Sequence, residues 1–511
     1  MLTLLGTKTT GSDHYYHGLL IDSIRGNRHR FISKLDNFLA DNYAFYPQLL
    51  HWILSFFSTP RALVIGKYSS VFFHYLSAGA LYWFIVELYP LLQLDTPLWE
   101  VLMYSGIIYV TTPYHYDMEN AKNLNISARG IGLFLGQLYT YAIVLAEQSG
   151  STHMLGVSVI AATLIFMSSQ FAIQYILFAT PLFALLFKSP ILLILPILGV
   201  IPFFVIMPKV AFLSFKGQLN HKRVYVKHLA KVYILSIRHS IWRDWVYDFW
   251  SILFSKKPED SISKRLGYVI TNPLFIVVFS MPFLLPLSYY IGINPYWDAN
   301  ISDGPYVLIV PIFIGILLFL GISFRFSRFL GEPERYIEFS IGVLALLTAL
   351  TFGMNDFSKI VIALSILTIL LRYYLYIAVV LKKRNEQFSN TLETIKEELL
   401  ELGKQKEIRL LSNNTWACKA FFHRKIKLFW VTLVSETTGS FHFKDIFRES
   451  YSYIDKDLIV PISKEFNINY LVIDMELAPD IEENLRRANV NFKKVKMYEQ
   501  YKLIELLGQD Q

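Results

Sequence analysis

Long apolar stretches alternate with short polar ones through most of the first 381 residues. Many of these stretches approach 20 residues, which is enough for a helix to cross about 30 Å of hydrocarbon. The pattern predicts transmembrane helices at about 63–90, 98–113, 129–147, 153–170, 171–188, 190–208, 268–291, 305–324, 337–354 and 357–381. The shorter apolar stretch at 43–58 predicts an interfacial or re-entrant helix. We therefore predict an all-α polytopic membrane protein with about ten transmembrane helices plus interfacial helices.

Two segments depart from this pattern. Residues 209–265 mix many Lys and Arg with Trp242, Trp245 and Trp250, a composition typical of helices at a membrane interface. Residues 382–511 predict a charged helix (about 385–408), strands near 427–434 and 469–474, a helix near 479–489 and a final strand pair. The chain thus divides into a transmembrane domain, 1–381, and a small soluble C-terminal α/β domain, 382–511. The transmembrane domain has external loops at 1–62, 114–128, 209–265 and 325–336.

Composition agrees with a membrane protein. Charged residues make up 17% of the chain, against roughly 25% in soluble domains. The net charge of +8 suits basic loops that meet anionic lipid head groups, so we expect membrane lipids as partners and no nucleic acid. Cys418 is the only cysteine, which excludes an internal disulfide and a cysteine metal cluster.

The first candidate site is the N-terminal motif Asp13-His-Tyr-Tyr-His17, which begins an amphipathic segment. Its apolar residues recur at helical spacing: Leu19, Leu20, Ile21 and Ile24. A carboxylate at the start of a helix on the membrane surface is placed to act as a general base on an acceptor hydroxyl. Asp13 could equally cap the helix, and the two roles are compatible. We also take His17 as a substrate-binding candidate.

The second candidate is an acidic loop between two predicted spans, which carries Asp117 and Glu119. Charges this close to hydrocarbon are costly unless they reach water or serve a function. As functional residues, they would be metal ligands or acid/base partners of Asp13. The alternative is a solvated loop that caps two helices.

The third candidate is the loop with Arg328, Glu334, Arg335 and Tyr336. The rigid donor fork of an arginine suits phosphate oxygens, so this loop could hold a lipid phosphate. The alternative is arginines that snorkel at a membrane boundary. If Asp13 faces one side of the membrane, the predicted spans return all the external loops and the C-terminal domain to that side. The positive-inside rule opposes this placement for the basic segment 209–265.

The motif at Asp13–His17, with the Leu-Leu-Ile-Asp-Ser-Ile-Arg that follows, resembles the first external loop of GT-C-type glycosyltransferases. This family of polytopic enzymes includes oligosaccharyltransferase catalytic subunits and protein mannosyltransferases. The stretch Tyr46-Pro-Gln-Leu-Leu-His51 resembles a Tyr-Pro-x-Leu-x-His stretch of bacterial members. Asp117-Met-Glu119 and Arg335 occupy places where the family carries an acidic motif and a phosphate-binding arginine. The family has a transmembrane helix before the first loop; twelve residues precede Asp13 here, so such a helix is either encoded upstream or absent.

The resemblance implies a glycosyltransferase with a sugar donor linked to polyprenyl phosphate and a glycan, lipid or protein acceptor. Asp13 would be the base, which gives inversion at the anomeric carbon. Arg335, with Lys222 or Arg223, would offset charge on the departing phosphate. Asp117 and Glu119 would bind a divalent cation (Mg²⁺ or Mn²⁺) or assist the base without metal. The protein would lie in a bacterial inner or plasma membrane, with the active-site loops and C-terminal domain on the non-cytoplasmic side. The alternatives are a flippase or transporter, or a polymerase, of lipid-linked glycans.

Overall fold

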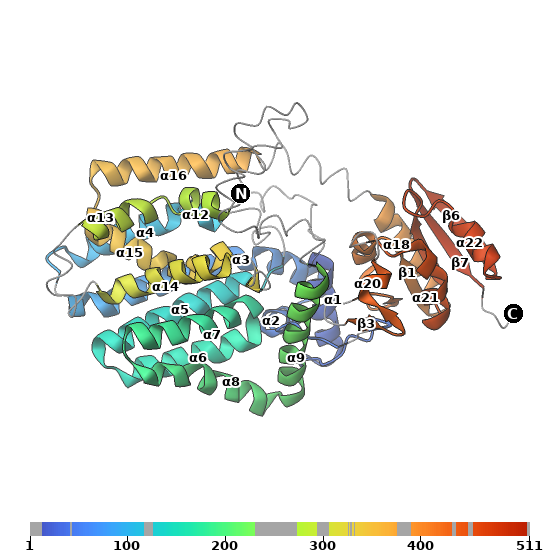
Figure 1. The fold of residues 1–511 in the computed structure, drawn as a ribbon, viewed down its shortest axis with the longest axis horizontal. Coiled ribbons are helices and arrows are strands. Elements are labelled where there is room, and N and C mark those ends of the chain that lie inside the picture. The colour runs from blue at the N-terminus through green and yellow to red at the C-terminus, as the bar shows by residue number, and fades with distance from the viewer. Residues whose placement is uncertain are drawn as a thin grey trace.

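The computed structural model describes residues 13–40, 43–92, 94–116, 126–229, 273–293, 306–324, 327, 330–331, 333–375, 390–431, 436–447 and 453–507. Most of the chain forms a bundle of helices, and a small mixed sheet follows near the C-terminus (Figure 1). The predicted combination of a helical domain with a small C-terminal α/β region is therefore confirmed.

The bundle and its flanking segments are built from helices of very unequal length. They are α1 (Asp13–Gly26), α2 (Leu49–Ser55), α3 (Thr59–Leu92), α4 (Leu98–Thr111), η1 (Pro113–Tyr116), α5 (Arg129–Ser149), α6 (Thr152–Ser168), α7 (Gln170–Leu186), η2 (Pro190–Leu193), α8 (Ile194–Ile206), α9 (Pro208–Val224), η3 (Tyr225–Leu229), α12 (Pro273–Ser280), α13 (Leu284–Ile293), α14 (Tyr306–Ile322), η7 (Pro333–Ser340), α15 (Ile341–Phe352) and α16 (Asp356–Leu375).

Apolar helices identify an integral membrane protein. Within the described residues, three helical segments are long and apolar enough to cross a membrane: Thr59–Leu92, Arg129–Ser149 and Pro333–Phe352. Five shorter apolar helices have between 10 and 17 residues: Leu98–Thr111, Thr152–Ser168, Gln170–Leu186, Pro190–Ile206 and Val307–Ile322. The figure of about ten transmembrane helices therefore stays a prediction.

Helix α1 differs from the helix that its amphipathic pattern suggested, one lying free on a membrane surface. Its apolar residues are at most 2% exposed, because protein covers the helix on two sides. Ile21 packs into the bundle beside Leu50 and Leu54 of α2. Leu20 and Ile24 pack instead into the core of the C-terminal domain. Helix α1 therefore connects the two parts of the molecule, as Figure 1 shows.

The C-terminal domain contains a five-stranded sheet in the order β2-β1-β5-β7-β6. Strands β2, β1 and β5 are parallel, and β5, β7 and β6 are antiparallel. Its elements are α18 (Asn390–Leu402), β1 (Ile408–Ser412), α19 (Thr415–Cys418), η9 (Lys419–Phe421), β2 (Ile426–Leu428), β3 (Thr437–Thr438), β4 (Phe441–His442), α20 (Phe443–Ile446), η10 (Lys456–Leu458), α21 (Ile459–Glu465), β5 (Tyr470–Asp474), α22 (Ile481–Arg487), β6 (Phe492–Tyr498) and β7 (Tyr501–Leu506).

Segments from the first part of the chain attach this domain to the bundle. The Leu39 amide donates to the Leu428 carbonyl at 2.9 Å, and the Leu428 amide donates to the Asn37 carbonyl at 2.7 Å, which extends the sheet beyond β2. The Lys227 ammonium, just beyond α9, pairs with Glu436 at 2.8 Å. The N-terminal segment thus shares a hydrophobic core with the C-terminal domain, and a division of the chain at residue 382 stays a prediction.

Close helix packing in the bundle depends on Gly136 of α5. A Cβ atom added there would lie 2.4 Å from the ring of Phe339 in η7. We expect Gly136→Ala to destabilise the bundle by about 1–3 kcal/mol, because overpacking forces buried side chains off their rotamers. Gly156→Ala in α6 is the matched control, since no atom lies within 4 Å of the added Cβ. Thermal unfolding in one detergent measures both; equal melting temperatures would contradict the expected clash.

Candidate active site

Helices α1, α2 and α9, which belong to the predicted external segments, lie at one end of the bundle (Figure 1). Contacts along α3 show where α1 and the flanks of the acidic loop lie. Its first turns contact α1, since Leu63 lies 3.2 Å from a Cβ added at Gly18. One turn further, Gly66 approaches Ile126 so closely that a Cβ would lie 2.7 Å from Cγ1. The rings of His74 and His115 lie 5.3 Å apart. The Ile126 flank of the acidic loop therefore lies near the first turns of α3, and the His115 flank lies near the middle of that helix.

A polar cluster at this end joins the last turn of α9 to α7 and η7. The Gln174 amide fits its surroundings when its oxygen accepts from the Lys222 ammonium at 2.9 Å. In that orientation its nitrogen donates to the Leu330 carbonyl at 2.8 Å and to the Tyr336 hydroxyl oxygen at 3.0 Å. Gln174 thus holds Lys222 beside the loop that carries Tyr336.

Two cations share this cluster. Burial, together with the neighbouring Arg335 guanidinium, lowers the pKa of Lys222 to about 8. Burial is the larger cause, because an ammonium loses its hydration there. An anion bound beside Lys222 would oppose both effects, since a nearby opposite charge favours the charged form of the ammonium.

Arg335 lies in η7 and contacts both aromatic and charged residues. Its guanidinium carbon is 5.5 Å from the centroid of the Phe171 ring, a cation–π contact. Arg335 also lines a cavity of about 10 Å³ with Arg129 and Glu338, room for about one water molecule. Glu338 and the neighbouring Glu334 are 3% and 2% exposed, so this loop buries two carboxylates beside the half-buried Arg335. The cations of the cluster are therefore the groups that can bind phosphate oxygens, whereas its carboxylates would repel them.

His17 contacts His51 and is not among the residues that form the cluster around Gln174. Its Nδ1 lies 2.7 Å from Nε2 of His51 in α2, so one ring donates and the other accepts. Burial and the neighbouring His17 lower the pKa of His51 well below its usual value. Tyr46 meets both rings edge-on, with centroids 5.5 and 5.7 Å away. The structure therefore places His17 in the packing of α1 against α2.

The remaining predicted site residues are distributed as follows. The structure brings Lys222, Arg335 and Tyr336 together, with Glu334 on the same loop. Arg223, the next residue after Lys222, is exposed and acts electrostatically on Glu436 of the C-terminal domain.

Asp13 begins α1, in the first turn, where a helix favours negative charge. Asp117, Glu119 and Arg328 lie outside the described residues, and so do the contacts of the Asp13 carboxylate. Within the described part of the chain, no group of three or more His, Cys, Asp or Glu side chains is placed to hold a metal ion. The catalytic and metal-binding roles of these residues stay predictions.

Sequence reasoning missed Gln174 and Phe171. Gln174 carries a usable signal, because an amide inside the apolar stretch 171–188 needs a hydrogen-bonding partner. Phe171 carries none, since one more aromatic residue in an apolar helix is ordinary. Arg129 follows the acidic motif in the sequence, and the structure places it beside Arg335 and Glu338.

No known family model matches this chain, and no curated protein matches it in sequence. Among solved structures, the chain is similar to the oligosaccharyltransferase AglB of Archaeoglobus fulgidus in complex with an inhibitory peptide and a dolichol-phosphate, with a TM-score of 0.49 and 12% identity. That match covers 91% of this chain and 66% of the archaeal chain, so this chain spans just under two thirds of it. Apo ArnT of Cupriavidus metallidurans is also similar (TM-score 0.49, 10% identity, 97% and 93% coverage).

Proposed function

We propose that this chain is an integral membrane glycosyltransferase of the GT-C type. It transfers a sugar from a polyprenyl-phosphate-linked donor to a glycan, lipid or protein acceptor, with inversion at the anomeric carbon. The observation that carries the proposal is the pair of cations, Lys222 and Arg335, held together beside Tyr336 at one end of a membrane bundle. A membrane-embedded phosphate is the anion that such a site is suited to bind.

Each of the proposed residues has a separate role in the reaction. The acceptor oxygen attacks the anomeric carbon, and the bond from that carbon to the phosphate oxygen breaks. The Asp13 carboxylate takes the acceptor proton. The phosphate leaves with the electron pair of the broken bond, and Lys222 and Arg335 stabilise the negative charge that develops on it. Positive groups fixed in place before the reaction do this without reorganisation, which is why a pair held by surrounding contacts favours catalysis.

Asp117 and Glu119 are the residues that would hold a divalent cation, and the cation would add positive charge near the same phosphate. Their spacing of two residues in a short loop suits carboxylate ligation. The steps above do not depend on this ion. We further propose that the active-site loops and the C-terminal domain lie on the non-cytoplasmic side of a bacterial inner or plasma membrane.

The experiment uses the full-length chain in lipid nanodiscs with a radiolabelled sugar on polyprenyl phosphate and a lipid acceptor. We expect a new glycosidic bond to form while polyprenyl phosphate is released. Product length separates a transferase, which adds one residue, from a polymerase, which gives a ladder. Movement of the donor across a proteoliposome membrane without a new bond would establish a flippase instead. A donor left intact across a panel of sugars, by protein that binds polyprenyl phosphate, would contradict the proposal.

A further inference from the structure

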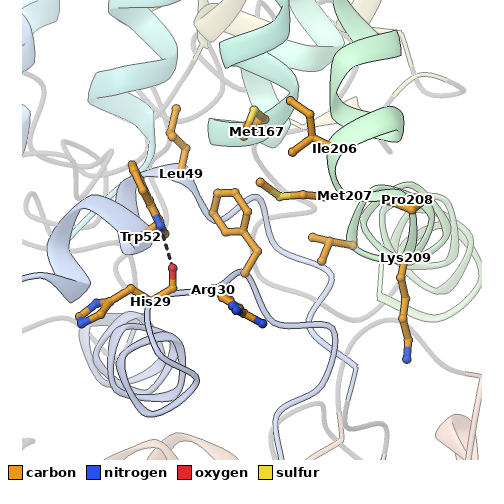
Figure 2. Close-up of a pocket in the computed structure, with 11 residues that line it drawn as sticks. His29, Arg30, Leu49, Trp52, Met167, Ile206, Met207, Pro208 and Lys209 are labelled. Atoms are coloured by element: carbon orange, nitrogen blue, oxygen red, sulfur yellow. Dashed lines mark hydrogen bonds between the residues drawn. The ribbon is translucent and has the colours of Figure 1, made fainter.

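A second pocket lies at the corner between α8 and α9, away from the cation pair. Its volume is about 520 Å³, within the usual range for small-molecule sites. Three basic residues line it: His29, Arg30 and Lys209. The other lining residues are apolar or aromatic: Phe31, Leu49, Trp52, Met167, Ile206, Met207, Pro208 and Val210. Figure 2 shows the nitrogen atoms of Arg30 and Lys209 on the side opposite Met167 and Ile206. The pocket is therefore amphipathic, with a positive edge and an apolar interior.

The loop that supplies Arg30 is held in an unfavourable backbone conformation. Arg28 and His29 both have positive φ values, 53° and 57°, which non-glycine residues seldom adopt. Hydrogen bonds fix the loop: Trp52 Nε1 donates to the His29 carbonyl at 2.9 Å (Figure 2), and His29 Nδ1 lies 2.9 Å from Ser55 Oγ. The His29 ring also stacks on Phe56 with centroids 4.6 Å apart. Strain maintained by surrounding contacts often marks a functional position, and here it directs Arg30 to the pocket edge.

The surface beside the pocket indicates which kind of ligand can reach it. Exposed apolar side chains flank it on both sides: Ile53, Phe56 and Phe57 near α2, and Ile201, Phe204, Val205, Ile206 and Phe212 on α8 and α9. An apolar surface of this extent on a membrane protein faces acyl chains. The basic edge therefore lies next to a surface suited to contact acyl chains.

The pocket is separate from the candidate active site. Lys209 and Lys222 are thirteen residues apart on the same helix, α9, which places them about 20 Å apart along its axis. Lys209 lies in the first turn of α9, where the helix dipole also favours an anion.

From these observations we infer that the pocket binds one anionic phospholipid of the surrounding leaflet. The phosphate lies between Arg30 and Lys209, and an acyl chain covers Leu49, Met167 and Met207. The charge of the edge selects an anionic head group over a zwitterionic one, because a neutral head group offers no net charge to the two cations. The bound lipid joins the loop after α1 to the α8–α9 corner and so stabilises the end of the bundle that carries the candidate site.

Native mass spectrometry of the full-length protein tests this inference. Protein in detergent is mixed with equal amounts of phosphatidylglycerol and phosphatidylcholine that carry identical acyl chains. We expect the wild-type protein to retain one phosphatidylglycerol in preference. In the double variant Arg30→Gln/Lys209→Gln we expect about 25-fold weaker retention, about fivefold for each cation removed. Lys216→Gln removes one positive charge from an exposed position of α9 that does not line the pocket. This control should leave the retention of phosphatidylglycerol unchanged.

A charge-conserving variant guards against simple misfolding. Arg30→Lys/Lys209→Arg keeps both charges and should keep the preference for phosphatidylglycerol. Equal retention of the two lipids by the wild-type protein would overturn the inference, and so would unchanged retention in the Gln double variant. Polyprenyl phosphate is added as a competitor in a third arm. If it displaces phosphatidylglycerol at equal concentration, and only when Arg30 and Lys209 are present, the pocket belongs to the donor and the inference is wrong.

Discussion

Lys222→Gln is expected to lower the rate of sugar transfer by about 10²–10³-fold, the usual cost of losing one group that stabilises a developing oxyanion. The variant keeps a polar side chain of similar length, so the Gln174 amide retains a partner. It removes the positive charge from beside Arg335, and the departing phosphate loses one of its two cations. Transfer from a radiolabelled lipid-linked sugar, measured at saturating donor, reports the loss.

Three single variants and one double variant test whether the loss is specific to the charge of Lys222. Lys222→Arg keeps the charge and should retain much of the activity. Lys216→Gln removes an exposed lysine from the same helix and should transfer sugar at the wild-type rate. Arg335→Gln should lose activity to a similar extent, and the double variant should lose less than the product of the two, because the residues act on one phosphate. A Lys222→Gln protein that folds and transfers at the wild-type rate would remove Lys222 from the mechanism.

The pH profile provides a second readout of the same residue. The pKa of Lys222 is lowered to about 8, so the amine is positive below pH 8 and neutral above it. Because only the charged form attracts the donor phosphate, kcat/KM should fall as pH rises through about 8 in the wild-type protein. Lys222→Arg should lack this fall, since a guanidinium keeps its proton throughout this range. A fall at the same pH in both proteins would assign it to another group.

Asp13→Asn is the second large effect that we expect, with transfer reduced by about 10²–10⁴-fold. The substitution separates the two interpretations of this residue. Asn caps a helix about as well as Asp, so a residue that only caps α1 tolerates the change. A general base does not, because an amide cannot take the acceptor proton. Sugar transfer is compared at equal protein level in membranes.

The matched control is Asp36→Asn, which removes an exposed carboxylate from the same N-terminal segment. Its transfer rate should equal that of the wild-type protein. The melting temperature of Asp13→Asn should also stay close to the wild-type value, since the cap is preserved. Full activity of Asp13→Asn would show that another group accepts the proton.

Sequence periodicity was most informative about the positions of single helices and strands. The apolar stretch at 63–90 falls within the helix Thr59–Leu92, and the strand near 469–474 corresponds to β5, Tyr470–Asp474. It was less informative about where an element ends. The strand near 427–434 is described as Ile426–Leu428; the Phe429 amide still donates to the Leu410 carbonyl of β1, and residues 432–435 lie outside the described residues.

For the candidate site, the sequence identified the cationic residues, and the tertiary structure showed which residues surround them. Arg335 and Tyr336 stood out in the sequence because charged and turn residues are dense in that loop. Lys222 and Arg223 could not be separated there, being neighbours of the same charge. The helical turn of α9 separates them, since successive residues point about 100° apart: Lys222 meets Gln174, and Arg223 is exposed.

The sequence by itself determined that this is a helical membrane protein with a small C-terminal α/β region, because apolar length and periodicity are local properties of the chain. Only the tertiary structure decided that α1 lies between the bundle and the C-terminal domain, that His17 pairs with His51, and that Lys222 lies close enough to Arg335 to be influenced by its charge. These contacts join residues from 34 to more than 100 positions apart. They depend on which helix faces cover each other, and no local pattern specifies that.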